Sequence, residues 1–106
     1  MQLSEFHVVQ INSEKPYRIV IYTDDIQETL NTEYKDENVT LLEEKDWTIE
    51  DYCTIVESLL EDVNAHKYCN KVYDIIATMR MVFISDTQIK EFLKQYVRHM
   101  FELYGY

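Results

Sequence analysis

Carboxylates are the side chains in this sequence that are numerous enough to do chemistry together. Fourteen of the twenty fall within residues 24–62, where only Lys35 and Lys45 oppose them, so this segment has a formal charge of −12 and the rest of the chain +2. Such a concentration of one sign produces a surface potential of several kT, which attracts cationic partners and repels nucleic acids and anionic membranes. We therefore expect a cationic protein partner, with no direct binding to nucleic acid and no membrane binding.

A metal site is the first alternative use for so many carboxylates. An EF-hand calcium loop needs alternating Asp or Asn ligands and a glycine at its sixth position, and residues 24–36 have neither. His66 and Cys69 have the spacing of two metal ligands, but a structural zinc site needs four and the sequence supplies no second pair. We expect neither a metal site nor a cofactor.

Catalysis needs groups with matched roles in a pocket that shifts their pKa values. The three histidines, His7, His66 and His99, fall in a predicted strand, a predicted turn and a predicted solvent-facing helix face. None forms a recognisable pair with a Ser or Cys nucleophile, and each is better explained as a surface or boundary side chain. We therefore expect a protein that is not an enzyme.

The composition favours one folded domain that spans residues 1–106. Hydrophobic residues make up 46% of the chain, and the only glycine is Gly105, which argues against the glycine-rich loops of nucleotide-binding folds. Cys53 and Cys69 fall on apolar faces of predicted helices, as reduced core thiols of cytosolic proteins do. Because the N-terminus lacks a signal-peptide pattern and no apolar run approaches roughly 18 residues, we expect a cytoplasmic protein.

The elements that position the acidic segment begin with strands. Residues 6–11 and 18–22 are short runs of β-branched and aromatic residues, which predict an antiparallel hairpin, and residues 39–42 are a candidate third strand. The second strand is apolar on both sides, so we expect it to be covered on both faces. A short helix should follow Asp25, which has the capping-box spacing to Glu28.

A better-marked helix is predicted to begin after Thr48. Thr48 and Asp51 have the spacing of a capping box, and Trp47 and Tyr52 have that of a hydrophobic staple. Apolar residues follow at helical spacing: Ile49, Tyr52, Cys53, Val56, Leu59, Leu60 and Val63. Acidic residues occupy the opposite side: Glu50, Asp51, Glu57, Glu61 and Asp62. One face of this helix should be core and the other a row of carboxylates.

Two more helices should follow after a break near residues 64–67, because the next apolar stripe is out of register with the first. Apolar residues cover nearly the whole circumference of residues 68–84, which predicts a helix at the buried centre, with Arg80 either reaching the surface or meeting a carboxylate. A last amphipathic helix should begin after Ser85, with Gln88 at the box position, and end at Gly105.

The predicted architecture is α+β. A small N-terminal antiparallel sheet, formed by the hairpin and a possible third strand, should pack on a three-helix unit, with one extra short helix.

An acidic helix face is often only a solvated surface, but three features favour a binding function here. The segment is hardly diluted by Lys or Arg, like charges such as Glu57 and Glu61 stand at i,i+4, and aromatic residues lie among the acids. The predicted partner-binding residues are Asp25, Glu28, Tyr34, Asp36, Glu37, Glu43, Glu44, Trp47, Glu50, Asp51, Glu57, Glu61 and Asp62.

These features favour a small inhibitor that occupies the basic cleft of a nuclease or other nucleic-acid-handling effector. Neighbouring carboxylates on a helix stand roughly 5–6 Å apart, close enough to imitate a phosphate backbone. Phage anti-restriction and anti-CRISPR proteins and toxin-immunity proteins use this strategy, an analogy of size and charge. The alternative is a structural or assembly subunit that associates through an apolar surface, with acids that only solvate it. The sequence leaves open a monomer or a homodimer.

Overall fold

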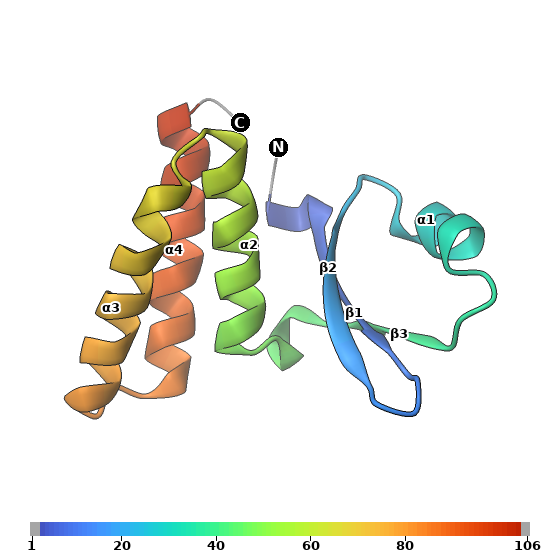
Figure 1. Ribbon diagram of the computed structural model, residues 1–106, viewed down its shortest axis with the longest axis horizontal. Coiled ribbons are helices and arrows are strands. Elements are labelled where there is room, and N and C mark those ends of the chain that lie inside the picture. The colour runs from blue at the N-terminus through green and yellow to red at the C-terminus, as the bar shows by residue number, and fades with distance from the viewer. Residues whose placement is uncertain (1–2, 105–106) are drawn as a thin grey trace. The chain divides into compact units, whose positions relative to one another are not determined.

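The computed structural model describes residues 3–104, which form two compact units. The N-terminal unit ends at Trp47, and the C-terminal unit begins at Thr48 (Figure 1). The expectation of a single domain stays a prediction, and the predicted helix stop at Gly105 lies outside the described residues. None of the helices in the described part of the chain has the length and apolar character needed to cross a membrane.

The N-terminal unit is built on a three-stranded antiparallel sheet. Strands β1 (Phe6–Ile11), β2 (Tyr17–Tyr22) and β3 (Val39–Leu42) are ordered β2-β1-β3. Val8 of β1 lies opposite Val20 of β2 and Leu42 of β3, which fixes the register on both sides. The predicted hairpin, the third strand and the α+β class are confirmed.

The prediction that the second strand is covered on both faces is wrong. β2 is an edge strand in which no residue is buried, whereas Phe6, Val8, Val9 and Ile11 of β1 are buried. The third strand pairs with β1 and not with β2, so β1 takes the centre of the sheet. The apolar residues of β2 match the half-buried surface of an edge strand.

Helix α1 (Ile26–Glu33) and the short 3₁₀ helices contribute charged side chains rather than residues of the hydrophobic core. The Asp25 side chain accepts a hydrogen bond from the Glu28 backbone N–H at 3.1 Å, which is one half of the predicted capping box; the Asp25 N–H donates to Thr23 Oγ1 at 3.2 Å. No residue of α1 is buried. Single 3₁₀ turns stand before β1, after β3 and before α3: η1 (Leu3–Glu5), η2 (Glu44–Asp46) and η3 (His66–Tyr68).

The C-terminal unit is a bundle of three helices: α2 (Ile49–Asp62), α3 (Cys69–Met81) and α4 (Asp86–Tyr104) (Figure 1). The capping box at the start of α2 is confirmed: Asp51 accepts the Thr48 N–H at 2.7 Å, and Thr48 accepts the Asp51 N–H at 3.2 Å. The second box, between Ser85 and Gln88, is also confirmed and starts α4.

The prediction that residues 68–84 form the buried central helix is wrong, because the most buried helix is α2 and not α3. Seven apolar residues of α2 are buried: Ile49, Tyr52, Cys53, Ile55, Val56, Leu59 and Leu60. In α3 only Cys69, Val72 and Ile76 are buried, a single stripe along one side. The remaining apolar residues of α3 therefore face away from the core, and a row of buried residues on α4 completes it: Ile89, Leu93, Val97 and Met100.

Helices α2 and α3 both end in a Schellman motif without glycine. After α2, the Ala65 N–H donates to the Leu60 carbonyl at 2.7 Å and Asn64 has φ 56°, which confirms the predicted break between the helices. After α3, the Ile84 N–H donates to the Met79 carbonyl at 2.9 Å and Phe83 has φ 62°.

The capping box gives the first testable prediction. Replacing Asp51 with alanine removes the acceptor of the Thr48 N–H at a buried helix start, so the free energy of unfolding of the helical unit should fall by about 1–2 kcal/mol. Urea denaturation followed by helical circular dichroism measures this change. Gln88→Ala, which removes the acceptor of the Ser85 N–H in the exposed box of α4, is the matched control in the same unit and should cost less. Equal losses in the two variants would contradict a special role for the buried box.

Candidate protein-binding surface

The outer face of α2 carries four of the predicted partner-binding acids. Glu50, Glu61 and Asp62 are exposed and Glu57 is partly exposed. They lie opposite the apolar stripe of the helix because that stripe is buried in the bundle. The predicted division of α2 into a core face and an acidic face is confirmed for these four residues.

Two contacts join the acidic face of α2 to α3. Arg80 Nη2 lies 3.5 Å from Glu50 Oε1, with both side chains at least half exposed, so Arg80 both reaches the surface and meets a carboxylate. The Tyr73 hydroxyl donates to Glu57 Oε1. These contacts hold two of the acids at the edge of α3 without burying them.

Between these contacts lies a groove of about 290 Å³ in the helical unit. Its lining combines two aliphatic residues, a thiol and the polar groups of the two helices: Ile49, Glu50, Cys53, Thr54, Tyr73, Ile76 and Arg80. The volume is close to the lower limit of small-molecule pockets and suits a single inserted side chain. The groove therefore offers an apolar floor beside an acidic rim.

Cys53, which lines this groove, and Cys69 are buried thiols with little nucleophilic character. Burial, followed by the charges of Glu50 and Glu57, raises the pKa of Cys53 to about 11, although Arg80 acts in the opposite direction. Burial and the charges of Glu57 and Glu61 also raise the pKa of Cys69. Both cysteines are free, as predicted, and the thiolate needed for nucleophilic catalysis is disfavoured at each.

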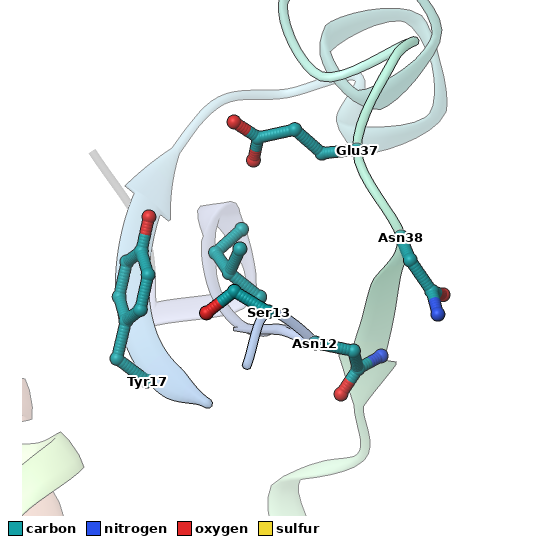
Figure 2. A pocket seen from close by; sticks show the side chains of 6 residues that line it. Asn12, Ser13, Tyr17, Glu37 and Asn38 are labelled. Atoms are coloured by element: carbon teal, nitrogen blue, oxygen red, sulfur yellow. The ribbon is translucent and has the colours of Figure 1, made fainter. Parts of the chain in front are cut away.

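The N-terminal unit carries its own exposed acids. The predicted residues found there with exposed carboxylates are Asp25, Glu28, Asp36, Glu37, Glu43 and Glu44. Glu37 lines a hollow of about 230 Å³ with Tyr17 and the Asn12–Ser13 turn, and Figure 2 shows its carboxylate pointing into the hollow opposite Tyr17. Ile11 is the one aliphatic residue in the lining of this hollow, and Glu37 is its one ionic group.

Two predicted residues do not belong to an exposed surface, and a third belongs only in part. Asp51 is 5% exposed and its carboxylate caps α2, and Trp47 is also 5% exposed, so neither is available to a partner as the prediction required. The short capping carboxylate lies beside the backbone of its own first turn, which takes it out of the row. Tyr34, at the end of α1, is partly exposed.

The chain has too few bases to neutralise its acids. Ten Lys and Arg side chains can pair one to one with at most ten of the twenty carboxylates. Within the described residues, the ion pairs of the acidic segment include Lys45–Glu43 at 3.2 Å and Arg80–Glu50 at 3.5 Å, all four side chains being at least half exposed. Such exposed pairs stabilise weakly, so a large excess of negative charge stays open to solvent.

Residues 3–104 contain no group of three or more His, Cys, Asp or Glu that could hold a metal ion. His7 Nε2 lies 3.2 Å from the Thr23 carbonyl oxygen, at the point where β2 ends, which is a structural contact.

The sequence reasoning missed the groove and the apolar turn beside it. The exposed apolar residues include three consecutive ones where α3 ends and the connection to α4 begins: Met81, Val82 and Phe83. A signal was present, because four large apolar residues in a row, residues 81–84, precede the helix cap and exceed what one core stripe needs.

Comparisons with known proteins add no relative to this picture. No protein-family model, no curated protein and no solved structure gives a significant match to the chain.

The position of the acids along α2 gives a prediction about stability. Glu61 and Asp62 end a helix that has no basic residue in its last turn, where carboxylates oppose the helix dipole. Replacing Asp62 with lysine should therefore raise the free energy of unfolding by about 0.3–1 kcal/mol. Glu50→Lys, in the first turn and paired with Arg80, should lower it. Urea denaturation measures both, and a loss of stability in Asp62→Lys would contradict the prediction.

The raised thiol pKa gives a second prediction. A shift of the Cys53 pKa from 9.0 to about 11 lowers its thiolate population at pH 8 by about 100-fold, so Cys53 should react much more slowly with an aromatic disulfide reagent than a free cysteine does. The reaction rate is measured from the absorbance of the aromatic thiolate that the reagent releases. Unfolding in urea should restore the rate of a free cysteine, and rapid labelling of the folded protein would contradict a buried, protonated thiol.

Proposed function

We propose that this protein is an inhibitor that binds the basic, nucleic-acid-binding cleft of a nuclease or effector through its exposed carboxylates. It would act by occlusion, competing with DNA or RNA for the cleft without being a nucleic acid. The observation that carries the proposal is the excess of exposed acids over bases.

The cost of these acids supports a function outside folding. Glu57 and Glu61 are like charges at i,i+4, and Glu61 and Asp62 lie at the unfavourable end of the dipole of α2, each effect being worth a few tenths of a kcal/mol or more. A helix face that serves only solvation would gain from lysines in those places. A cationic partner would instead convert the repulsion into binding energy and accelerate association.

The geometry of α2 supports the imitation of a phosphate backbone. Residues Glu50, Glu57 and Glu61 follow at i, i+7 and i+11 and therefore lie along one side of the helix. Lys and Arg side chains that neutralise phosphates in a nucleic-acid cleft bind carboxylates by the same charge-assisted hydrogen bonds.

Charge reversal tests this function. The target is captured on the immobilised protein from lysate of the host or of its virus-infected cells and eluted with salt; the purified pair should form a 1:1 complex and displace a labelled DNA or RNA duplex from the target. Glu57→Lys with Glu61→Lys should weaken displacement by about 10-fold or more. Fluorescence anisotropy of the labelled duplex measures it.

The matched control reverses the same number of charges on another helix. Glu91 and Glu102 are exposed on α4, and Glu91→Lys with Glu102→Lys gives the same net charge as the test variant. Equal affinity of the test variant and the wild-type protein would remove the proposal, and equal loss in both variants would show that net charge alone matters and not the face of α2.

A second candidate is a structural or assembly subunit that associates through an apolar surface. The exposed apolar residues between α3 and α4 favour it, because large apolar side chains at adjacent exposed positions mark interaction sites. Size-exclusion chromatography with light scattering separates the two functions: a homodimer insensitive to salt favours the assembly subunit.

A further inference from the structure

The turn between α3 and α4 exposes more apolar surface than folding requires. Met81 is 78% exposed, Val82 is 62% exposed and Phe83 is 94% exposed. Single exposed apolar residues are common, but three consecutive large ones at the end of a bundle form a contiguous patch. We call these three residues the apolar turn.

Phe83 is also an unfavourable residue for the backbone conformation that it adopts. With φ 62° it occupies the left-handed region, where a bulky side chain is a rare exception. The same position of the same motif after α2 is filled by Asn64, a residue that tolerates this region. The left-handed position is therefore filled by a favourable asparagine at the end of α2, but by an unfavourable, exposed phenylalanine at the end of α3.

The groove between α2 and α3 begins where the apolar turn starts. Arg80, which lines the groove, directly precedes Met81, and the groove also takes in Ile49 and Glu50 from the first turn of α2. The apolar floor of the groove and the apolar turn therefore lie at the same end of the helical unit. The exposed side chain of Tyr73, which also lines the groove, extends this surface along α3.

The charges around this surface decide between a second copy of the chain and a different partner. Glu50 and Glu57 border the groove, and only Arg80 offsets them among the residues that line it. A second copy would bring the same acids, and a net charge of −10, to the interface. A partner segment with Lys or Arg beside its apolar side chains is complementary to both features.

We propose that the groove and the apolar turn form the anchor site for a cationic amphipathic segment of a partner protein, which inserts an apolar side chain between α2 and α3. This inference rests on the proposed function, because it names where and how the basic target is held. The acids of α2 would steer the partner and fix its orientation, while the groove and the apolar turn supply the desolvated contact.

A designed peptide tests the anchor site. The probe is a fluorescently labelled helical peptide of Leu and Lys, with Leu at i, i+3, i+4 and i+7, and its binding to the full chain is measured by anisotropy. Phe83→Asn should weaken binding by about tenfold or more, and it should raise the urea midpoint, because asparagine suits the left-handed backbone. Thr54→Trp, which fills the groove from its exposed edge, should weaken binding similarly.

Two controls separate this site from general attraction to an acidic protein. Leu103→Asn removes an apolar side chain of α4 that is 64% exposed and should leave binding unchanged. A peptide with every Leu replaced by Ser should bind weakly, and to the same extent to the wild-type protein, Phe83→Asn, Thr54→Trp and Leu103→Asn. Together with the losses in Phe83→Asn and Thr54→Trp, these results support the anchor site.

Three results would overturn the proposal. If Phe83→Asn and Thr54→Trp bind the peptide as wild type does while Glu57→Lys with Glu61→Lys weakens binding, the anchor site falls and the acidic-surface function stands. If none of these variants changes binding, both fall. If light scattering shows a wild-type dimer that Phe83→Asn dissociates, a second copy covers the apolar turn.

Discussion

Repulsion between carboxylates that lack basic partners is the constraint on which the rest of this structure depends. Twenty acids face ten Lys and Arg side chains, and most acids of residues 24–62 are exposed. Repulsion among so many like charges destabilises the folded state. The fold must therefore obtain its stability elsewhere, and it does so through apolar burial and through hydrogen bonds at helix starts. α2 combines both, because its inner side holds seven buried apolar residues and its capping box includes Asp51, the one buried acid among residues 3–104.

The same helix connects stability with the proposed function. Its buried stripe is held against α4 by the aliphatic row that includes Ile89, Leu93 and Val97, so its outer acids are fixed on a rigid element. α3 contributes differently: one stripe is buried, and its other side and its C-terminal turn stay exposed. The helical unit thus presents acidic and apolar surface side by side along α2 and α3, a composition typical of protein-binding sites with aromatic or aliphatic anchors. The N-terminal unit adds a second exposed acidic surface on a small sheet and α1.

Local signals allowed much of the fold to be predicted from the sequence. The capping boxes of α2 and α4, the hairpin, the third strand and the break after α2 depend on neighbouring residues, and all were confirmed. The errors concern which side of an element its neighbours cover. An apolar circumference does not tell how many helices pack on α3, and an apolar second strand does not tell that β1 takes the centre of the sheet. Exposed acids on α2 could be predicted from their spacing, whereas the groove could not, because it exists only when two helices meet. The left-handed Phe83 had no local signal either, since glycine or asparagine is expected there.

The most direct measurement compares the salt dependence of stability with that of binding in the same protein. Between about 50 mM and about 500 mM NaCl, screening should relieve the repulsion among the acids and raise the free energy of unfolding, while it weakens the complex with the cationic target. If the acids are uncompensated in the fold and bind the target, added salt should raise the free energy of unfolding and lower the affinity for the target. A fall in stability with salt would show that the acids are paired within the fold, and an affinity unaffected by salt would show that they do not hold the partner; either result would contradict the account.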